Sequence, residues 1–172
     1  MPISLHAAVV PSWIQILNSG QGWLDKAAAS GLPEQEIIGA KLADDMLPLA
    51  YQVRSMADHS QGAIEALRQG VFRPKFGEPL PSSLAEMHER LSGAIAFLAA
   101  IDPNELEGCV GQPMRFEIGE KRIDFAAEEF LLSFSQPNFY FHATTAYGIL
   151  RHKGVAVGKL DYLGKLRTSA LA

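Results

Sequence analysis

The sequence has little cysteine, no long hydrophobic run and no surplus of positive charge. Cys109 is the only cysteine among 172 residues, so the chain can form no internal disulfide. No apolar run reaches the roughly 18 residues of a membrane-spanning helix, and no basic and apolar leader is recognisable. The formal net charge is −4, which gives nucleic acid and anionic membrane surfaces no electrostatic attraction. We therefore expect a soluble, cytoplasmic protein that binds neither nucleic acid nor membranes.

The common catalytic motifs are also missing. The sequence contains no GxGxxG, no P-loop, no GxSxG and no CxxC. Cys109 has no neighbouring histidine or basic residue that would stabilise a thiolate, so a structural thiol is favoured over a nucleophile. Any chemistry must therefore come from isolated polar residues that the fold brings together.

The hydrophobic pattern predicts a single all-α domain over residues 1–172. Hydrophobic residues make up 48% of the chain, which is enough for a sizeable core without disulfides or metal. Apolar residues recur at steps of three and four in four segments, each typical of an amphipathic helix. These segments run from Ser4 to Ala29, from Asp44 or Asp45 to Gly70, from Ser82 or Ser83 to Asp102, and from about Ala126 to His152. A tail of about residues 155–172 follows.

One segment has a different period. Between about residues 112 and 125, apolar and charged side chains alternate on either side of a turn at Gly119. This pattern predicts a β-hairpin inserted before the last helix. Because an isolated hairpin is marginally stable in water, its apolar face must pack on the helices or on a partner subunit.

The last helix carries apolar side chains on nearly every side. A helix of this kind is usually covered all round, and three other helices cover one face only. The second face consists of Phe139, Tyr140, Ala143, Tyr147 and Leu150. Two coverings are about equally favoured: a second copy of the chain in a homodimer, or the hairpin or tail of the same chain.

Two polar residues of the last helix, Asn138 and His142, lie one turn apart on one face. His59 lies beside the apolar stripe of the second helix, where it can face a crevice between helices. Taken alone, His59 is more typical of a partly buried histidine that is bonded to backbone or water. We expect these three residues to share a crevice with Met56, Phe141 and Thr145.

The segments DHSQGA, PNFYFHATTAYGILRHKG and GKLDYLG together resemble a bacterial family of domains of unknown function in the DinB/YfiT-like superfamily of metalloenzymes. The resemblance extends from PISLHAAVVP to DYLG. It implies a four-helix bundle, often dimeric, with a site between the second and fourth helices. Better-studied relatives bind zinc or nickel through one histidine of the second helix and an HxxxH pair of the fourth. Some relatives are thiol-dependent transferases or isomerases.

The resemblance implies that His59 is the second-helix ligand and His142 the second member of the fourth-helix pair. Asn138 stands where the first histidine of that pair is expected. Zinc prefers imidazole or thiolate to a neutral amide oxygen, so two histidines and Asn138 would hold a divalent metal weakly.

Two functions follow, and the sequence alone does not decide whether the protein is an enzyme. The first is a dimeric bundle that binds a small molecule or a partner through a degenerate metal-site crevice. The second is a divalent-metal-dependent enzyme, similar to thiol transferases or hydrolases, that uses His59 and His142. The metal-free pocket or hydrogen-bond cluster is ranked slightly above the metal.

Overall fold

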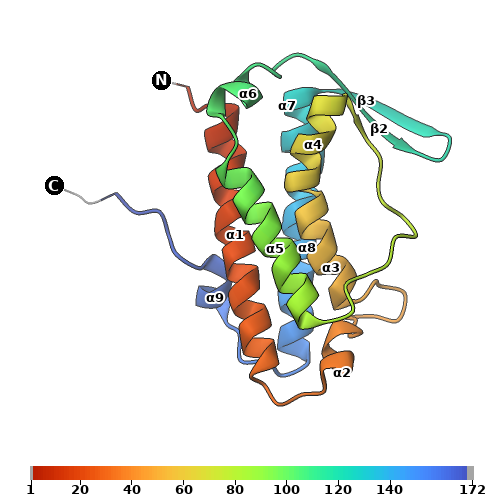
Figure 1. Ribbon diagram of the computed structural model, residues 1–172, viewed down its shortest axis with the longest axis vertical. Helices are drawn as coiled ribbons and strands as arrows, with labels where there is room; N and C mark the ends of the chain where they lie inside the picture. The colour runs from red at the N-terminus through yellow and green to blue at the C-terminus, as the bar shows by residue number, and fades with distance from the viewer. Residues whose placement is uncertain (1, 170–172) are drawn as a thin grey trace.

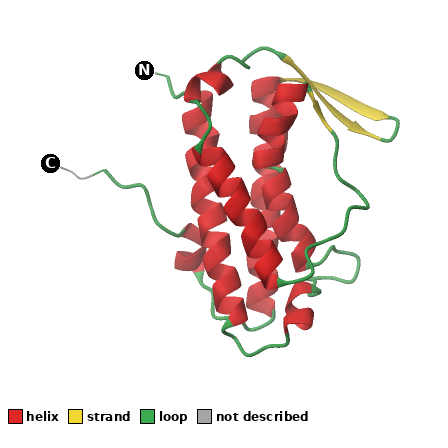
Figure 2. Cartoon of the chain, in the orientation of Figure 1, coloured by secondary structure: helices red, strands yellow, loops and turns green. Residues whose placement is uncertain are grey.

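The computed structural model describes residues 2–169, and these form a mainly helical protein with one small sheet (Figures 1 and 2). The helices are α1 (Leu5–Ala28), α2 (Glu34–Ile38), α3 (Leu49–Asp58), α4 (Gln61–Gln69), α5 (Leu84–Ala99), α6 (Pro103–Glu107), α7 (Ala127–Glu129), the π-helix η1 (Phe130–Ser135), α8 (Gln136–His152) and α9 (Lys159–Leu163). The strands are β1 (Val71–Phe72), β2 (Pro113–Ile118) and β3 (Lys121–Ala126). The last three residues of the predicted tail lie outside the described part.

The long helical segments pack lengthwise around one apolar core (Figure 1). Its largest fully buried side chains include Trp13 and Trp23 of α1, Phe130 of η1 and Phe139 of α8. None of the helices between residues 2 and 169 is long and apolar enough to cross a membrane.

Local signals in the sequence fix several helix ends. The Ser4 hydroxyl accepts a hydrogen bond from the Ala7 N–H at 3.1 Å, and Ser83 caps α5 in the same way through Glu86 N. The Glu86 carboxylate accepts a hydrogen bond from the Ser82 N–H at 2.7 Å. In a capping box it would accept from the N–H of Ser83 instead. Gly70 ends α4 in the left-handed conformation that glycine favours, with φ of 71°.

The second predicted helix is interrupted and begins later than expected. Asp44 and Asp45 lie in a turn, and α3 begins after Pro48. The helix then breaks at Ser60, where φ is −120° and ψ is −83°, before α4 resumes. The Ser60 hydroxyl donates to the carbonyl of Met56 at 2.7 Å, which is a local bond that competes with regular helix. His59 therefore lies at a helix end, where backbone groups need other partners.

The last predicted helix is not a regular α-helix along its whole length. It begins as α7, continues as the π-helix η1 and becomes regular again in α8. Pro137 has no N–H for the carbonyl four residues earlier, so the α-helical bond to Ser133 cannot form. A π-helical segment directly before the proline is one way to accommodate that missing bond, and such segments are frequent at functional sites.

The sheet contains one strand more than the predicted hairpin. β2 pairs antiparallel with β3, and β1 adds a short parallel pairing in which Val71 lies opposite Arg115. The hairpin packs on its own chain, because Phe116 and Phe125 contact Phe134 with ring centroids 4.9 and 5.8 Å apart.

The second face of the last helix is covered within the chain. Phe139 packs against Trp13, with ring centroids 6.1 Å apart. Farther along the helix, Tyr147 and Tyr162 of α9 both contact the Trp23 indole. The tail thus supplies one of the two coverings considered for this face, and the homodimer stays a prediction.

Candidate functional site

The fold brings His59 and His142 into direct contact. His59 ends α3 and His142 lies in the first half of α8, which packs along α3. Their imidazole rings are stacked, with centroids 5.6 Å apart and 15° between the planes. Two residues 83 positions apart in sequence therefore form one unit between these helices.

A glutamine of α3 holds the ring of His142. His142 Nδ1 lies 2.7 Å from Gln52 Oε1, and Gln52 Nε2 donates to the carbonyl of Leu47 at 2.9 Å. The bond to Leu47 fixes the amide orientation, so Oε1 faces His142 and accepts a proton from Nδ1. The lone pair of His142 is then at Nε2.

A serine of η1 is the corresponding neighbour of His59. Ser135 Oγ donates to the His59 carbonyl at 3.0 Å and lies 3.5 Å from His59 Nδ1. Because its single proton is used on the carbonyl, the hydroxyl can accept from Nδ1 but not donate to it, and this contact favours the tautomer with the His59 lone pair at Nε2. Gln52 thus holds His142 while Ser135 contacts His59, each acting on the histidine of the facing segment.

Both histidines are neutral at physiological pH. Burial lowers the pKa of His59 to about 3, and the proximity of His142 adds to this shift. Burial also lowers the pKa of His142 to about 4. Each imidazole therefore keeps one N–H donor and one acceptor nitrogen throughout the range from pH 5 to pH 8.

These residues do not fit a zinc site with three strong ligands. The amide of Asn138 is tied to its own helix, since Nδ2 donates to the carbonyl of Phe134 at 2.7 Å. His59 and His142 are then the only strong zinc ligands of the three residues, because a neutral amide oxygen is a poor zinc ligand. Within residues 2–169, no group of three or more His, Cys, Asp or Glu side chains is placed to hold a metal ion.

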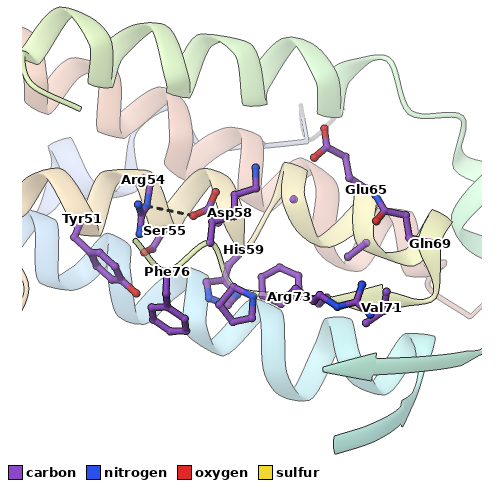
Figure 3. A pocket seen from close by; sticks show the side chains of 15 residues that line it. Tyr51, Arg54, Ser55, Asp58, His59, Glu65, Gln69, Val71, Arg73 and Phe76 are labelled. Atoms are coloured by element: carbon purple, nitrogen blue, oxygen red, sulfur yellow. Dashed lines mark ion pairs between the residues drawn. The ribbon is translucent and has the colours of Figure 1, made fainter. Parts of the chain in front are cut away.

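A cavity of about 200 Å³ opens beside His59, and we call it the His59 cavity. It lies between α3, α4 and the segment that follows α4 (Figure 3). The side chains that dominate its wall are Tyr51, Arg54, Asp58, His59, Phe72 and Phe76. Phe72 also stacks on the imidazole of His59, with centroids 5.3 Å apart.

The other predicted site residues do not line the His59 cavity. Met56 is completely buried in the core, and Thr145 is buried on α8. Phe141 is 57% exposed and meets His142 edge-on at 5.3 Å. The structure thus brings His59, His142 and Phe141 together, while Asn138 is bonded to Phe134 of η1 and Met56 belongs to the core.

Sequence reasoning missed several residues of this site. Gln52 precedes His59 by seven positions, and Ser135 precedes His142 by seven, so each pair lies on one helical face. That spacing was a usable signal. Arg54 also had a signal, because it lies four residues before the oppositely charged Asp58, a spacing that is typical of a helix-surface pair. No sequence pattern marked Phe72 or Phe76 as a site residue, since both fall in the segment after the second predicted helix.

Comparisons with known proteins agree with this architecture. Residues 5–163 match the family described as a domain of unknown function, DUF1993. A crystal structure of a DinB family member protein from Shewanella denitrificans is similar, with a TM-score of 0.79 and 28% sequence identity. The match covers 96% of this chain and 95% of that one. No curated protein matches the sequence.

Proposed function

We propose that this chain, which belongs to the DUF1993 family of domains of unknown function, binds a small molecule in the His59 cavity without a metal ion. The ligand donates a hydrogen bond to the neutral imidazole of His59 at Nε2. The scaffold in this proposal is a DinB-like four-helix bundle with a hairpin inserted before the last helix. The mutual packing of the long helices and the similarity to a DinB family member support that scaffold.

The observation that carries the proposal is the stacked pair of His59 and His142. His59 lines the cavity, and its Nδ1 side is directed to Ser135. Stacking on His142 and on Phe72 restricts rotation of the ring. A neutral acceptor held in this way suits a ligand that offers an O–H or N–H group.

A screen of small molecules tests the proposal, with NMR shifts of residues around the cavity as the readout. The informative variant is His59→Phe, which keeps an aromatic ring for stacking and removes the acceptor nitrogen. We expect compounds that bind the wild-type protein to lose at least tenfold in affinity, since a buried donor is then left without a partner. His88→Phe, at a half-exposed histidine of α5, is the matched control and should not change binding.

Two results would contradict the proposal. In the first, no compound shifts the signals of the cavity residues. In the second, compounds bind His59→Phe and wild-type protein equally well, which would assign the binding to another surface.

The second candidate is a divalent-metal-dependent enzyme, similar to thiol transferases or hydrolases, that uses His59 and His142. One observation favours it: both imidazoles direct Nδ1 toward a protein acceptor, as metal-binding histidines commonly do. Elemental analysis of purified protein for zinc and nickel, with thermal unfolding in the presence of either ion, separates the two functions. Zinc or nickel bound in a stoichiometric amount would favour the enzyme over our proposal. No bound metal, and no change in the unfolding temperature with either ion, would rule against the enzyme.

We also retain the homodimer as a proposal. Its support within one chain is the exposed side chain of Phe141, because Phe139 is buried and Tyr140 and Tyr147 are only partly exposed. Light scattering at several protein concentrations should give the mass of two chains. A stable monomer would remove the dimer and leave the small-molecule proposal intact, since one chain lines the whole His59 cavity.

A further inference from the structure

The His59 cavity contains a buried cation with unused hydrogen-bond donors. The side chain of Arg54 is 4% exposed and lines the cavity. Its Nη1 donates to the carbonyl of Glu78 at 3.1 Å, and Nε has no hydrogen-bond partner among the described residues. A guanidinium has five N–H donors, so most of its capacity to bind a planar anion is unspent.

The neighbouring carboxylate does not balance the positive charge around the cavity. Asp58 Oδ2 lies 3.6 Å from Arg54 Nε, but Asp58 Oδ1 also lies 3.7 Å from Arg90 Nη1. One carboxylate therefore faces two arginines. Lys75 adds positive charge to the wall, whereas the charge of Arg73 is paired with Glu117 at 2.6 Å. Glu65 is the only other acidic residue among those that line the cavity.

The electrostatics of Asp58 point in the same direction. Burial raises the pKa of Asp58, although Arg90 and Arg54 both counteract that rise. Lys75 also counteracts the rise in the pKa of Asp58, whereas Glu78 adds to it. The arrangement leaves Arg54 able to pair with a second anion, at the cost of repulsion between that anion and Asp58.

The remaining wall suits a flat apolar body. Tyr51 lies under the Arg54 guanidinium, 4.9 Å from it, and Phe76 lies near Tyr51 at the same end of the cavity (Figure 3). Phe72 and His59 form the continuation of this aromatic lining. The volume of about 200 Å³ equals the share of about seven waters at ~30 Å³ each, which is enough for a molecule with a single ring.

We propose that the His59 cavity selects small planar carboxylic acids, whose carboxylate pairs with Arg54 while a hydroxyl or amino group on the ring donates to His59. This inference rests on the proposed function and adds the chemical class of the ligand. It requires no covalent step.

The test compares 4-hydroxybenzoate with 4-hydroxybenzamide, which has a similar shape and no charge, by titration calorimetry or NMR. We expect the wild-type protein to bind the acid at least tenfold more tightly than the amide. Arg54→Met should abolish that preference. Arg90→Met removes the same charge beside the same Asp58 from a residue outside the cavity wall, and it should keep the preference.

Asp58→Asn provides a test that does not depend on the stability of the Arg54 variant. Removing the competing carboxylate should strengthen binding of the acid several-fold and leave the amide unchanged. Equal binding of acid and amide to the wild-type protein, with both weakened in His59→Phe, would overturn this inference and leave the proposed function standing. Binding of neither compound would also overturn it, and the proposed function would then depend on the wider screen.

Discussion

The imidazole of His59 lies stacked on that of His142, and each ring has its Nδ1 side turned toward a polar residue of the facing segment. Gln52 and Ser135, which provide these contacts, are respectively 2% exposed and fully buried. Removing either partner would leave a buried polar group without its bond, which costs about 1–3 kcal/mol. The pair is therefore a fixed element of the interface between α3 and the last helical segment.

The neutral state of this pair should make folding sensitive to acid. An unfolded chain takes up protons on both histidines near pH 6.5, whereas the folded chain takes them up only near pH 3 for His59 and pH 4 for His142. Unfolding therefore binds protons between these values, and stability falls as the pH falls. Each histidine contributes a slope of about 1.4 kcal/mol per pH unit.

Denaturant unfolding of wild-type protein and of His59→Phe between pH 4.5 and pH 6 measures this slope. We expect the variant to lose up to about 1.4 kcal/mol per pH unit of the dependence, since carboxylates contribute equally to both proteins. Identical slopes would show that the pKa of His59 is the same in the folded and the unfolded chain, which would contradict its burial as a neutral imidazole.

The bond from His142 to Gln52 should set the protonation of His142. In Gln52→Glu, a carboxylate replaces the amide oxygen 2.7 Å from Nδ1 and stabilises the imidazolium. We expect the pKa of His142 to rise from about 4 toward or above its ordinary value of about 6.5. Imidazole nitrogen shifts in NMR report it directly. Gln112→Glu, at an exposed loop position, is the control. A His142 ring that stays neutral at pH 5 in Gln52→Glu would contradict the assigned hydrogen bond.

Much of the helical framework could be predicted from the sequence, because its apolar stripes and caps are local signals. Ser4, Ser83 and Gly70 mark helix ends through bonds or dihedral angles that involve only nearby residues. The break at Ser60 could not be predicted in this way, since the apolar stripe continues unchanged across it. The strand β1 depends on pairing with β2, more than 40 residues away. Because β1 has only two residues, it shows no alternation of apolar and polar side chains that could be recognised in the sequence.

The site was predictable only in part for the same physical reason. Helical spacing placed His59 and His142 on inward faces, but it could not show that their rings stack or which residues receive their N–H groups. Asn138 has a bond to Phe134 within its own helix, which helical spacing allows but does not require. The cavity wall depends on Phe72 of β1 and on Phe76 of the segment that follows it, and both line the cavity together with residues of α3.

Asn138→His should create the metal affinity that the present residues lack. It adds a third imidazole one turn from His142, and three imidazoles are an established zinc ligand set. We expect zinc to bind at least tenfold more tightly than to the wild-type protein, as measured by competition with a chelating dye. Thr144→His, on the exposed side of α8, is the control. Unchanged affinity in Asn138→His would mean that the stacked histidines cannot turn toward a shared ion.

The tail should be a stabilising cover for the aromatic face of α8. Tyr162 stacks on Trp23, with centroids 5.5 Å apart and 13° between the planes, and its hydroxyl lies 3.1 Å from Thr144 Oγ1. Since the ring is partly buried, Tyr162→Ala should lower the free energy of unfolding by about 2 kcal/mol. Leu160→Ala changes an 82% exposed side chain of the same short helix and should cost much less.

Tyr162→Phe separates the two contributions of this residue. It keeps the ring on Trp23 and removes only the hydroxyl of an exposed hydrogen bond, so we expect a loss of about 1 kcal/mol or less. Denaturant unfolding of the three variants gives the ranking. If Tyr162→Ala were no less stable than Leu160→Ala, the ring of Tyr162 would not hold α9 on α1. The aromatic face of α8 would then be free for a second copy of the chain.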